Sequence, residues 1–369
     1  MKFNKNLFIA FSSNIQTTHP TSKSLLKINQ YLTKFSFICF MASCSNLNAE
    51  DFIPNGSINF TQTFYGNAGS YKTRTSHPAI TVNYQFSPKW SAQVEWNRTW
   101  NMFTYTGEEN QLNNSYSGPE FTINYNYGAL GNSKIDWSSS LLVKYENDFE
   151  DASQTFAMAQ SILNFSEYLP KYKYLDVTQF ALAPTYYYGW NSSGPSGHTN
   201  TVGLGLLTNS QITTDLSFTF NAYALRNWNQ GNSFVTNPDD SHENANYFIV
   251  FSYLNYGKEI FKFNDRTSLD FNFITGFDPW VSSNKHSTVE PFFISNEMYE
   301  WMSPTVLNGS YKNTFTFFSL PQLQLNYDFS KDLSFNLFVQ TKYSNQVWGD
   351  QEKAWKFQPQ GGFSITHNF

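Results

Sequence analysis

The chain has 369 residues, of which 19% are aromatic and only 14% are charged, and its formal net charge is −5. Charged residues make up about a quarter of a typical soluble domain. The longest largely apolar stretch, residues 35–42, is much shorter than the ~18 residues that a transmembrane helix needs. The composition therefore argues against an ordinary soluble domain and against a helical membrane protein.

The first 49 residues have the features of a secretory signal peptide. Basic residues up to Lys34 precede the apolar stretch, and the small residue Ala49 precedes an expected cleavage site before Glu50. An alternative is processing at Met41-Ala42-Ser43-Cys44, which loosely resembles a lipoprotein box. The sequence therefore predicts a signal peptide at 1–49 and a single mature domain at 50–369.

Removal of this segment changes the charge and the chemistry of the chain. Residues 1–49 contain five of the 23 basic residues, none of the 28 acidic ones, and both cysteines, Cys39 and Cys44. The mature chain then has 18 basic against 28 acidic side chains, a net charge near −10. We therefore expect no nucleic-acid partner, no disulfide bond and no thiolate chemistry.

After residue 50 the sequence alternates between apolar and polar residues with a period of two. In residues 79–86 the even positions are apolar and the odd positions from 81 onward are polar. A turn at 87–89 leads to a similar segment at 90–100. A second such hairpin joins 321–329 to 333–343. This alternation predicts antiparallel strands with one apolar and one polar face.

The same pattern recurs along the mature chain. Further strands are expected at 57–66, 119–127, 135–147, 154–165, 174–190, 200–208, 215–228, 245–256, 267–278, 313–320 and 355–369. Short turns are expected near Ser87, Leu130, Tyr168, Ser210, Asn264 and Lys331. Longer loops are expected near 67–77, 101–118, 148–153, 191–199, 229–244, 279–312 and 344–354. Alternation of short turns with long loops predicts an all-β, transmembrane, antiparallel up-and-down β-barrel of about fourteen strands, with twelve or sixteen as alternatives.

The last strand ends the chain. Phe363, Ile365 and the terminal Phe369 share one parity, whereas Ser364 and Thr366 share the other. This segment resembles the closing strand of bacterial outer-membrane β-barrels, and the resemblance implies recognition by the barrel assembly machinery. The chain from about 57 to 369 resembles monomeric outer-membrane porins of the OmpG, oligogalacturonate-porin and FomA types. The resemblance implies a location in the outer membrane of a Gram-negative bacterium, contact with its lipid and lipopolysaccharide, and passage of ions and small hydrophilic solutes.

The polar face of the expected strands is rich in amides and hydroxyls, which a water-filled lumen would solvate. Acidic residues exceed basic ones on this face, so we expect a weak preference for cations. The residues expected to line the pore are Glu95, Glu120, Lys144, Glu146, Asp270, Asp328, Lys342, Asn83, Gln85, Asn124, Gln322, Gln324, Asn326, Asn336 and Gln340.

Arg98 and Arg226 fall on the apolar face, near the loop ends of their strands. One hypothesis is that they form a rim that binds lipopolysaccharide phosphates as forked donors. The alternative is that they turn inward at a bulge or extend to water.

The sequence has no arrangement typical of an enzyme, a cofactor site or a metal site. Of the mature histidines, the first four are expected in loops, and none has a partner at metal-ligand spacing. These histidines are His77, His198, His242, His286 and His367. No Gly-x-Ser-x-Gly motif and no phosphate-binding loop is present. We therefore predict a pore without catalytic residues, cofactor or metal.

Several alternatives stay open. The aromatic-rich loop at 279–312 could constrict the lumen or cap its mouth. A non-conducting surface barrel acting as adhesin or antigen is favoured by large side chains on the polar face, namely Leu142, Tyr187, Tyr223 and Phe338. A transporter for hydrophobic solutes, a barrel enzyme and a soluble β-protein are further alternatives.

Overall fold

The computed structural model describes residues 52–68, 75–101, 116–148, 153–193, 197–231, 244–284, 313–345 and 355–369. The predicted signal peptide at 1–49 and the alternative processing site at 41–44 lie outside these residues. The chain divides into two units, Met1–Phe52 and Ile53–Phe369, and the second forms a β-barrel.

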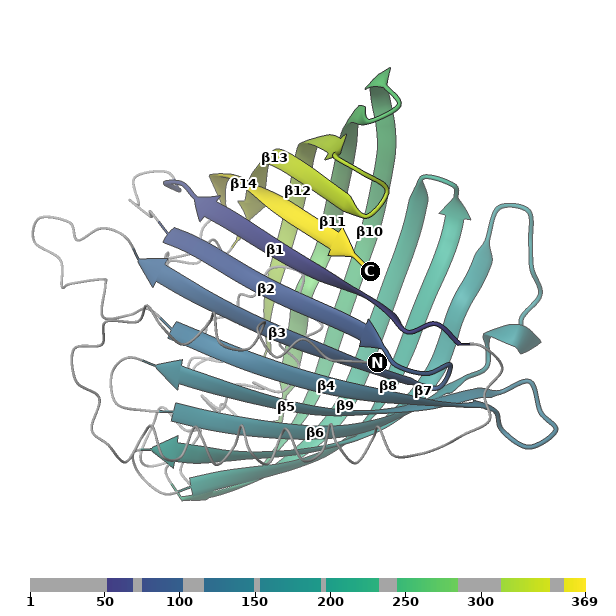
Figure 1. Ribbon diagram of the computed structural model, residues 1–369. Helices are drawn as coiled ribbons and strands as arrows, with labels where there is room; N and C mark the ends of the chain where they lie inside the picture. Colours follow the sequence, from purple (N-terminus) through teal and green to yellow (C-terminus); the bar gives the residue numbers. More distant parts are fainter. Residues whose placement is uncertain are drawn as a thin grey trace, which may run out of the picture. The chain divides into compact units, whose positions relative to one another are not determined.

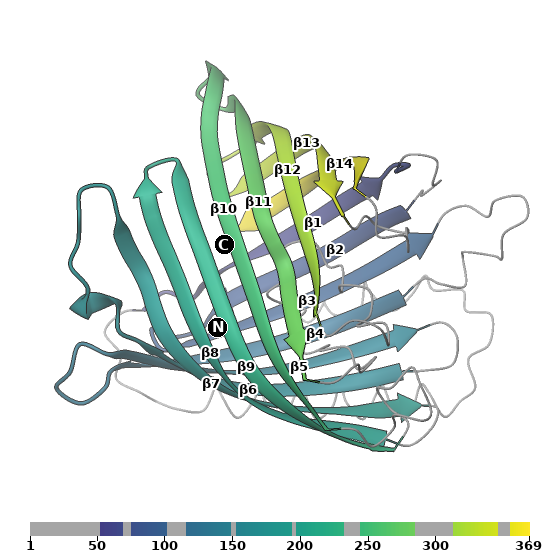
Figure 2. The ribbon, with the colours of Figure 1, turned by 180° about the vertical axis from the view of Figure 1, so that it is seen from behind.

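Fourteen antiparallel strands close the barrel, each paired with its neighbours in sequence (Figures 1 and 2). They are β1 (Asn55–Tyr65), β2 (Thr75–Gln85), β3 (Trp90–Asn101), β4 (Tyr116–Ala129), β5 (Asp136–Asp148), β6 (Ser153–Asn164), β7 (Asp176–Ser193), β8 (Gly197–Thr213), β9 (Leu216–Gly231), β10 (Ala245–Asn264), β11 (Thr267–Ser283), β12 (Asn313–Asp328), β13 (Leu333–Ser344) and β14 (Lys356–Asn368). The predicted fold class and strand number are confirmed. In the described part of the chain, no helix has the length and apolar character needed to cross a membrane.

Closure depends on pairing of the first strand with the last. β14 pairs with β13 on one side and with β1 on the other. At the last residue, Phe369 and Gly56 exchange two backbone hydrogen bonds of 2.9 and 3.0 Å. Pairing of the first strand with the last leaves no open sheet edge.

Six connections join consecutive strands at one end of the barrel, here named the turn end, where Asn55 and Phe369 also lie. The opposite end is named the loop end. At the turn end, aromatic rings contact one another in series from β14 to β5, with centroids 3.9–6.2 Å apart. These rings belong to Phe369, Tyr84, Phe86, Trp90, Tyr125, Tyr127 and Trp137. Aromatic belts of this kind are typical of the membrane–water interface of β-barrels.

At the turn end, β8 and β10 extend well beyond their predicted ends. A turn was expected near Ser210, but β8 continues to Thr213 and the chain turns at 214–215, where Gln211 Nε2 donates to the carbonyl oxygen of Leu216 at 3.2 Å. β10 was expected to end at residue 256 but runs to Asn264, because β11 pairs with it from Gly257 onward. Near Ser210 the local turn signal was outweighed by cross-strand pairing, whereas the turn expected near Asn264 is present at 265–266, directly after β10.

The loop-end connections also differ from the prediction in places. β7 and β8 leave only residues 194–196 between them, so the expected loop at 191–199 is wrong in extent. β11 continues to Ser283, so the first residues of the expected loop at 279–312 are strand, and 285–312 lie outside the described residues. His77 and His198 lie in β2 and β8 rather than in loops, and His242 and His286 fall outside the described residues.

Candidate functional site

The inner face of the barrel is identified by rows of cross-strand partners, which share a face of a sheet. Tyr187, Thr201, Asn227 and Ala245 are successive partners on β7–β10, and each is at most 4% exposed. The alternate residues of these strands include Tyr186, Val202 and Phe248, each 44–46% exposed. The buried row therefore faces the inside, and the exposed row forms the outer face.

The register assigns every predicted pore-lining position to the inner face. On β2–β5 these positions are Asn83, Gln85, Glu95, Asn124, Glu120, Lys144 and Glu146. On β11–β13 they are Asp270, Gln322, Gln324, Asn326, Asp328, Asn336, Gln340 and Lys342. The side chain of Glu146 lies outside the described residues.

These residues differ in their access to water. Glu95, Glu120 and Asp270 are partly exposed, and Asp328 is exposed. In contrast, Lys144 is 3% exposed and Lys342 is 0% exposed, with its Nζ 5.6 Å from the centroid of the Phe318 ring. Parity places all of these residues on the inner face, but it does not distinguish the accessible acids from the buried bases.

Amide side chains form a continuous row across four strands. Asn272 Nδ2 donates to Gln322 Oε1 at 3.0 Å, Gln322 Nε2 donates to Gln340 Oε1 at 2.7 Å, and Gln340 Nε2 donates to Gln360 Oε1 at 2.5 Å. The four residues are direct cross-strand partners on β11–β14. The row gives this part of the inner face a neutral, strongly polar surface.

Carboxylates face one another across two strand pairs. Glu95 lies opposite Glu120 on β3 and β4, and Glu259 lies opposite Asp270 on β10 and β11. Asn97 Nδ2 donates to Glu95 Oε1 at 3.2 Å, and Asn326 Nδ2 donates to Asp270 Oδ2 at 2.7 Å. Like charges directly opposite one another are unfavourable in a sheet. Glu120 is also the direct partner of Lys144 on β5, so the first of these pairs has a basic residue beside it.

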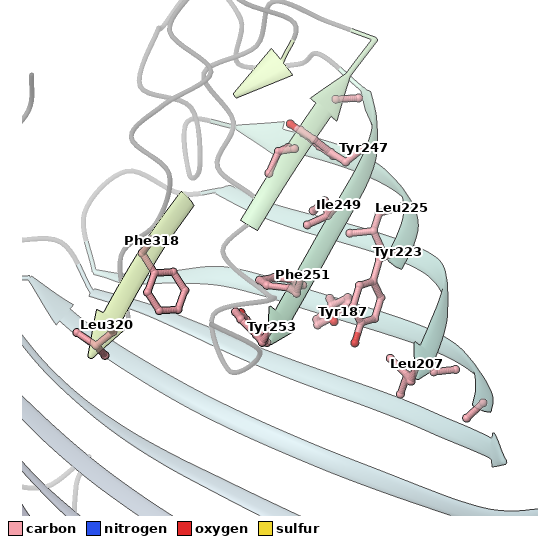
Figure 3. Close-up of a cluster of buried hydrophobic side chains, with 14 residues drawn as sticks. Tyr187, Leu207, Tyr223, Leu225, Tyr247, Ile249, Phe251, Tyr253, Phe318 and Leu320 are labelled. Atoms are coloured by element: carbon pink, nitrogen blue, oxygen red, sulfur yellow. The ribbon is translucent and has the colours of Figure 1, made fainter. Parts of the chain in front are cut away.

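A buried hydrophobic cluster occupies the loop-end part of the inner face on β7–β12 (Figure 3). Its larger members include Tyr187, Leu207, Tyr223, Leu225, Tyr247, Ile249, Phe251, Tyr253, Phe318 and Leu320. Tyr253 Oη donates to Asp278 Oδ1 at 2.6 Å inside it. Of these residues, only Tyr187 and Tyr223 were predicted from the sequence as large side chains on the inner face. The signal was present in β10, where residues 247–251 are apolar at every position and so must be apolar on the inner face as well.

The four large residues noted in the sequence are all buried on the inner face, with exposures of 1–9%. They are Leu142, Tyr187, Tyr223 and Phe338. A part of the lumen is therefore filled by side chains rather than lined by polar groups.

Arg226 lies on the outer face of β9 near the loop end, where its guanidinium is 5.4 Å from the centroid of the Trp228 ring. Its side chain is exposed. Arg98 lies on β3 opposite Ser117. Its neighbour Asn97 is on the inner face, so Arg98 is on the outer face, and its side chain is partly exposed. The pairings of β3 with β4 and of β8 with β9 run without a register shift through Arg98 and Arg226. Neither arginine is therefore turned into the lumen by a bulge.

Within the described segments, no group of three or more His, Cys, Asp or Glu side chains is arranged to hold a metal ion.

Comparison with known proteins gives structural neighbours but no sequence relatives. No family model and no curated protein matches the chain. A structure titled bacterial polysaccharide outer membrane secretin is 7% identical, with 87% of this chain and 100% of that chain covered and a TM-score of 0.37. The NanC porin is 10% identical, with 83% and 98% covered and a TM-score of 0.34. The toluene transporter TodX of Pseudomonas putida is 10% identical, with 87% and 90% covered and a TM-score of 0.33.

Proposed function

We propose that the protein is an outer-membrane channel through which ions and small hydrophilic solutes diffuse passively, with a weak preference for cations. The observation that carries the proposal is the contrast between the two faces of a closed barrel. The outer face is apolar, with an aromatic belt at the turn end, whereas the inner face carries accessible amides, hydroxyls and carboxylates. A surface of this kind fits lipid outside and water inside.

Both the number and the accessibility of the inner-face acids favour cations. Glu95, Glu120 and Asp270 keep access to water on the inner face, whereas Lys144 and Lys342 are buried. An ion in the lumen can approach the accessible acids directly, whereas side chains cover the buried bases and keep the ion from contacting them.

The location follows from the same features. The sequence has a segment with signal-peptide character, and the apolar outer face with its aromatic belt suits insertion into a Gram-negative outer membrane. In this orientation the turn end faces the periplasm and the loop end faces outward. Lipid, lipopolysaccharide and the barrel assembly machinery are the proposed partners.

The decisive experiment is refolding of residues 50–369 in detergent, followed by single-channel recording in a planar bilayer under a salt gradient. Steady open steps with a reversal potential on the cation-selective side are the expected result. A folded, heat-modifiable protein that never conducts would contradict the channel function.

A second candidate function is a non-conducting barrel that displays its loops as an adhesin or antigen. The buried cluster on β7–β12 favours this candidate, because its large side chains fill a part of the lumen. Electrical silence of the folded barrel, together with binding of intact cells to a host surface, is the result expected for it.

A further inference from the structure

Access to water is unevenly distributed around the inner face. On β1 the inner-face residues Ser57, Asn59, Thr61 and Thr63 are all partly exposed. On the neighbouring β2, inner-face positions from residue 77 to residue 85 are also partly or fully exposed. In these two strands, accessibility therefore continues from the turn end toward the loop end.

The opposite wall behaves differently. On β7 the inner-face positions from Ala181 to Gly189 are all buried, and on β10 those from Ala245 to Tyr253 are all buried. On these two strands, turn-end positions such as Gln179 on β7 and Asn255 on β10 keep access to water. Buried side chains cannot line a water-filled path, so this wall is closed to solutes in its loop-end half.

We propose that solutes cross the barrel along an eccentric path against the inner face of β1 and β2, and that Glu95 and Glu120 on the adjacent strands set its preference for cations. This inference rests on the proposed channel function. It locates the conducting route and its selectivity within the barrel, away from the buried cluster.

The position of the two glutamates fits this role. Glu95 lies directly opposite Thr81 of β2, and Glu120 lies directly opposite Glu95. Both side chains are partly exposed, whereas Lys144, the partner of Glu120 on β5, is 3% exposed. The carboxylate pair thus lies beside the accessible strip. Lys144, the basic residue next to the pair, is almost completely buried.

A basic residue near this strip, Lys356, should weaken the preference for cations. Lys356 lies on the inner face of β14 at its loop end and is partly exposed. A cation in the loop-end part of the path would pass a positive charge there before it reaches the carboxylates. Removal of this charge by K356Q is therefore expected to increase cation preference.

The route is tested with a matched pair of cysteine variants, because residues 50–369 contain no cysteine. Ala79 on β2 and Ala183 on β7 are both inner-face alanines, but Ala79 is partly exposed and Ala183 is 0% exposed. A cationic thiol reagent added to open channels should reduce the current of A79C severalfold and leave that of A183C unchanged. Block of A183C with no effect on A79C, in variants that remain heat-modifiable, would overturn the eccentric path.

The selectivity assignment is tested by reversal potentials of E95Q and E120Q, alone and combined. The combined variant should lower the cation-to-anion permeability ratio severalfold. E259Q is the matched control, because Glu259 is an exposed inner-face acid on the turn-end extension of β10. An effect of E259Q as large as that of the combined variant would contradict the assignment. A wild-type barrel that folds but never conducts would instead refute the channel function itself, together with this path.

Discussion

Individual buried polar side chains on the inner face are held by hydrogen bonds between strands. Thr201 Oγ1 donates to Asn227 Oδ1 at 2.6 Å, and the two residues are 0% and 1% exposed. T201V keeps the shape of the side chain but leaves the amide oxygen without this donor. Loss of a partner by a buried polar group costs about 1–3 kcal/mol.

We therefore expect T201V to lower the free energy of unfolding by about 1–3 kcal/mol in urea titrations of the detergent-refolded barrel. T155V is the control, because Thr155 and Ser192 form a hydrogen bond of 2.6 Å that is exposed. Equal destabilisation by the two variants would show that burial does not determine the cost.

On the outer face, Arg226 bears on the hypothesis of a lipopolysaccharide rim. Its exposed guanidinium lies 5.4 Å from the centroid of the Trp228 ring, and a guanidinium can donate two parallel hydrogen bonds to a phosphate. R226Q combined with R98Q should reduce the acceleration of folding by lipopolysaccharide-containing vesicles relative to phospholipid vesicles. K258Q, which removes an outer-face charge near the turn end, should leave this ratio unchanged. An unchanged ratio in the arginine variant would support simple extension of the side chains to water.

Sequence parity predicts the face of a residue well but not its burial. Lys144 and Lys342 lie on the expected face, yet both are buried. The accessibility of an inner-face side chain depends on which other side chains cover it from within the lumen. No local pattern records those contacts. The charge of the accessible lumen is therefore better judged from the structure than from a count of inner-face residues.

At the scale of strands, the hydrophobic cluster joins neighbouring elements through close side-chain contacts. Gly205 on β8 lies opposite Tyr223 on β9, and a Cβ at Gly205 would be 2.7 Å from Tyr223 Cε1 and 3.3 Å from the Cβ of Ala183. The ring thus occupies the space that a side chain on Gly205 would need. Larger residues in a packed core force such neighbours to shift.

G205A should accordingly lower the free energy of unfolding by about 1–3 kcal/mol, as measured by urea titration of the refolded protein. G361A serves as the comparison, because a Cβ there would meet its nearest neighbour at 3.4 Å, an ordinary contact. A loss of stability in G361A equal to that in G205A would mean that glycine in a strand, rather than packing against Tyr223, is the cause.

The ends of strands show where the sequence is insufficient. β3 and β13 match their predicted ranges to within a residue, because a turn and a clear alternation bound each of them. β10 is longer than predicted, because its last residues pair only with β11 and pass beyond the end of β9. Staggering of neighbouring strands is a property of barrel closure, and a single strand's composition does not record it.

At the scale of the whole molecule, β1 and β14 close the barrel, and Phe369 lies at their junction. Its backbone pairs with Gly56, and its ring lies 6.2 Å from that of Tyr84 between centroids. A Cβ at Gly56 would be 2.8 Å from Cζ of Phe369, so the ring lies directly over the glycine. The last residue therefore contributes both to closure and to the aromatic belt at the turn end.

This double role separates two effects of F369A. Backbone pairing of β14 with β1 does not need the ring, so refolding in detergent should reach the same heat-modifiable state with only a modest loss of stability. Assembly in cells should fall severalfold if the terminal aromatic residue is read by the assembly machinery, as measured by the folded fraction in the outer membrane. F357A is the matched control, because Phe357 is an exposed outer-face residue at the other end of the same strand. Equal loss of assembly in both variants would assign the defect to the strand's apolar face, and failure of F369A to refold in detergent would assign it to closure of the barrel.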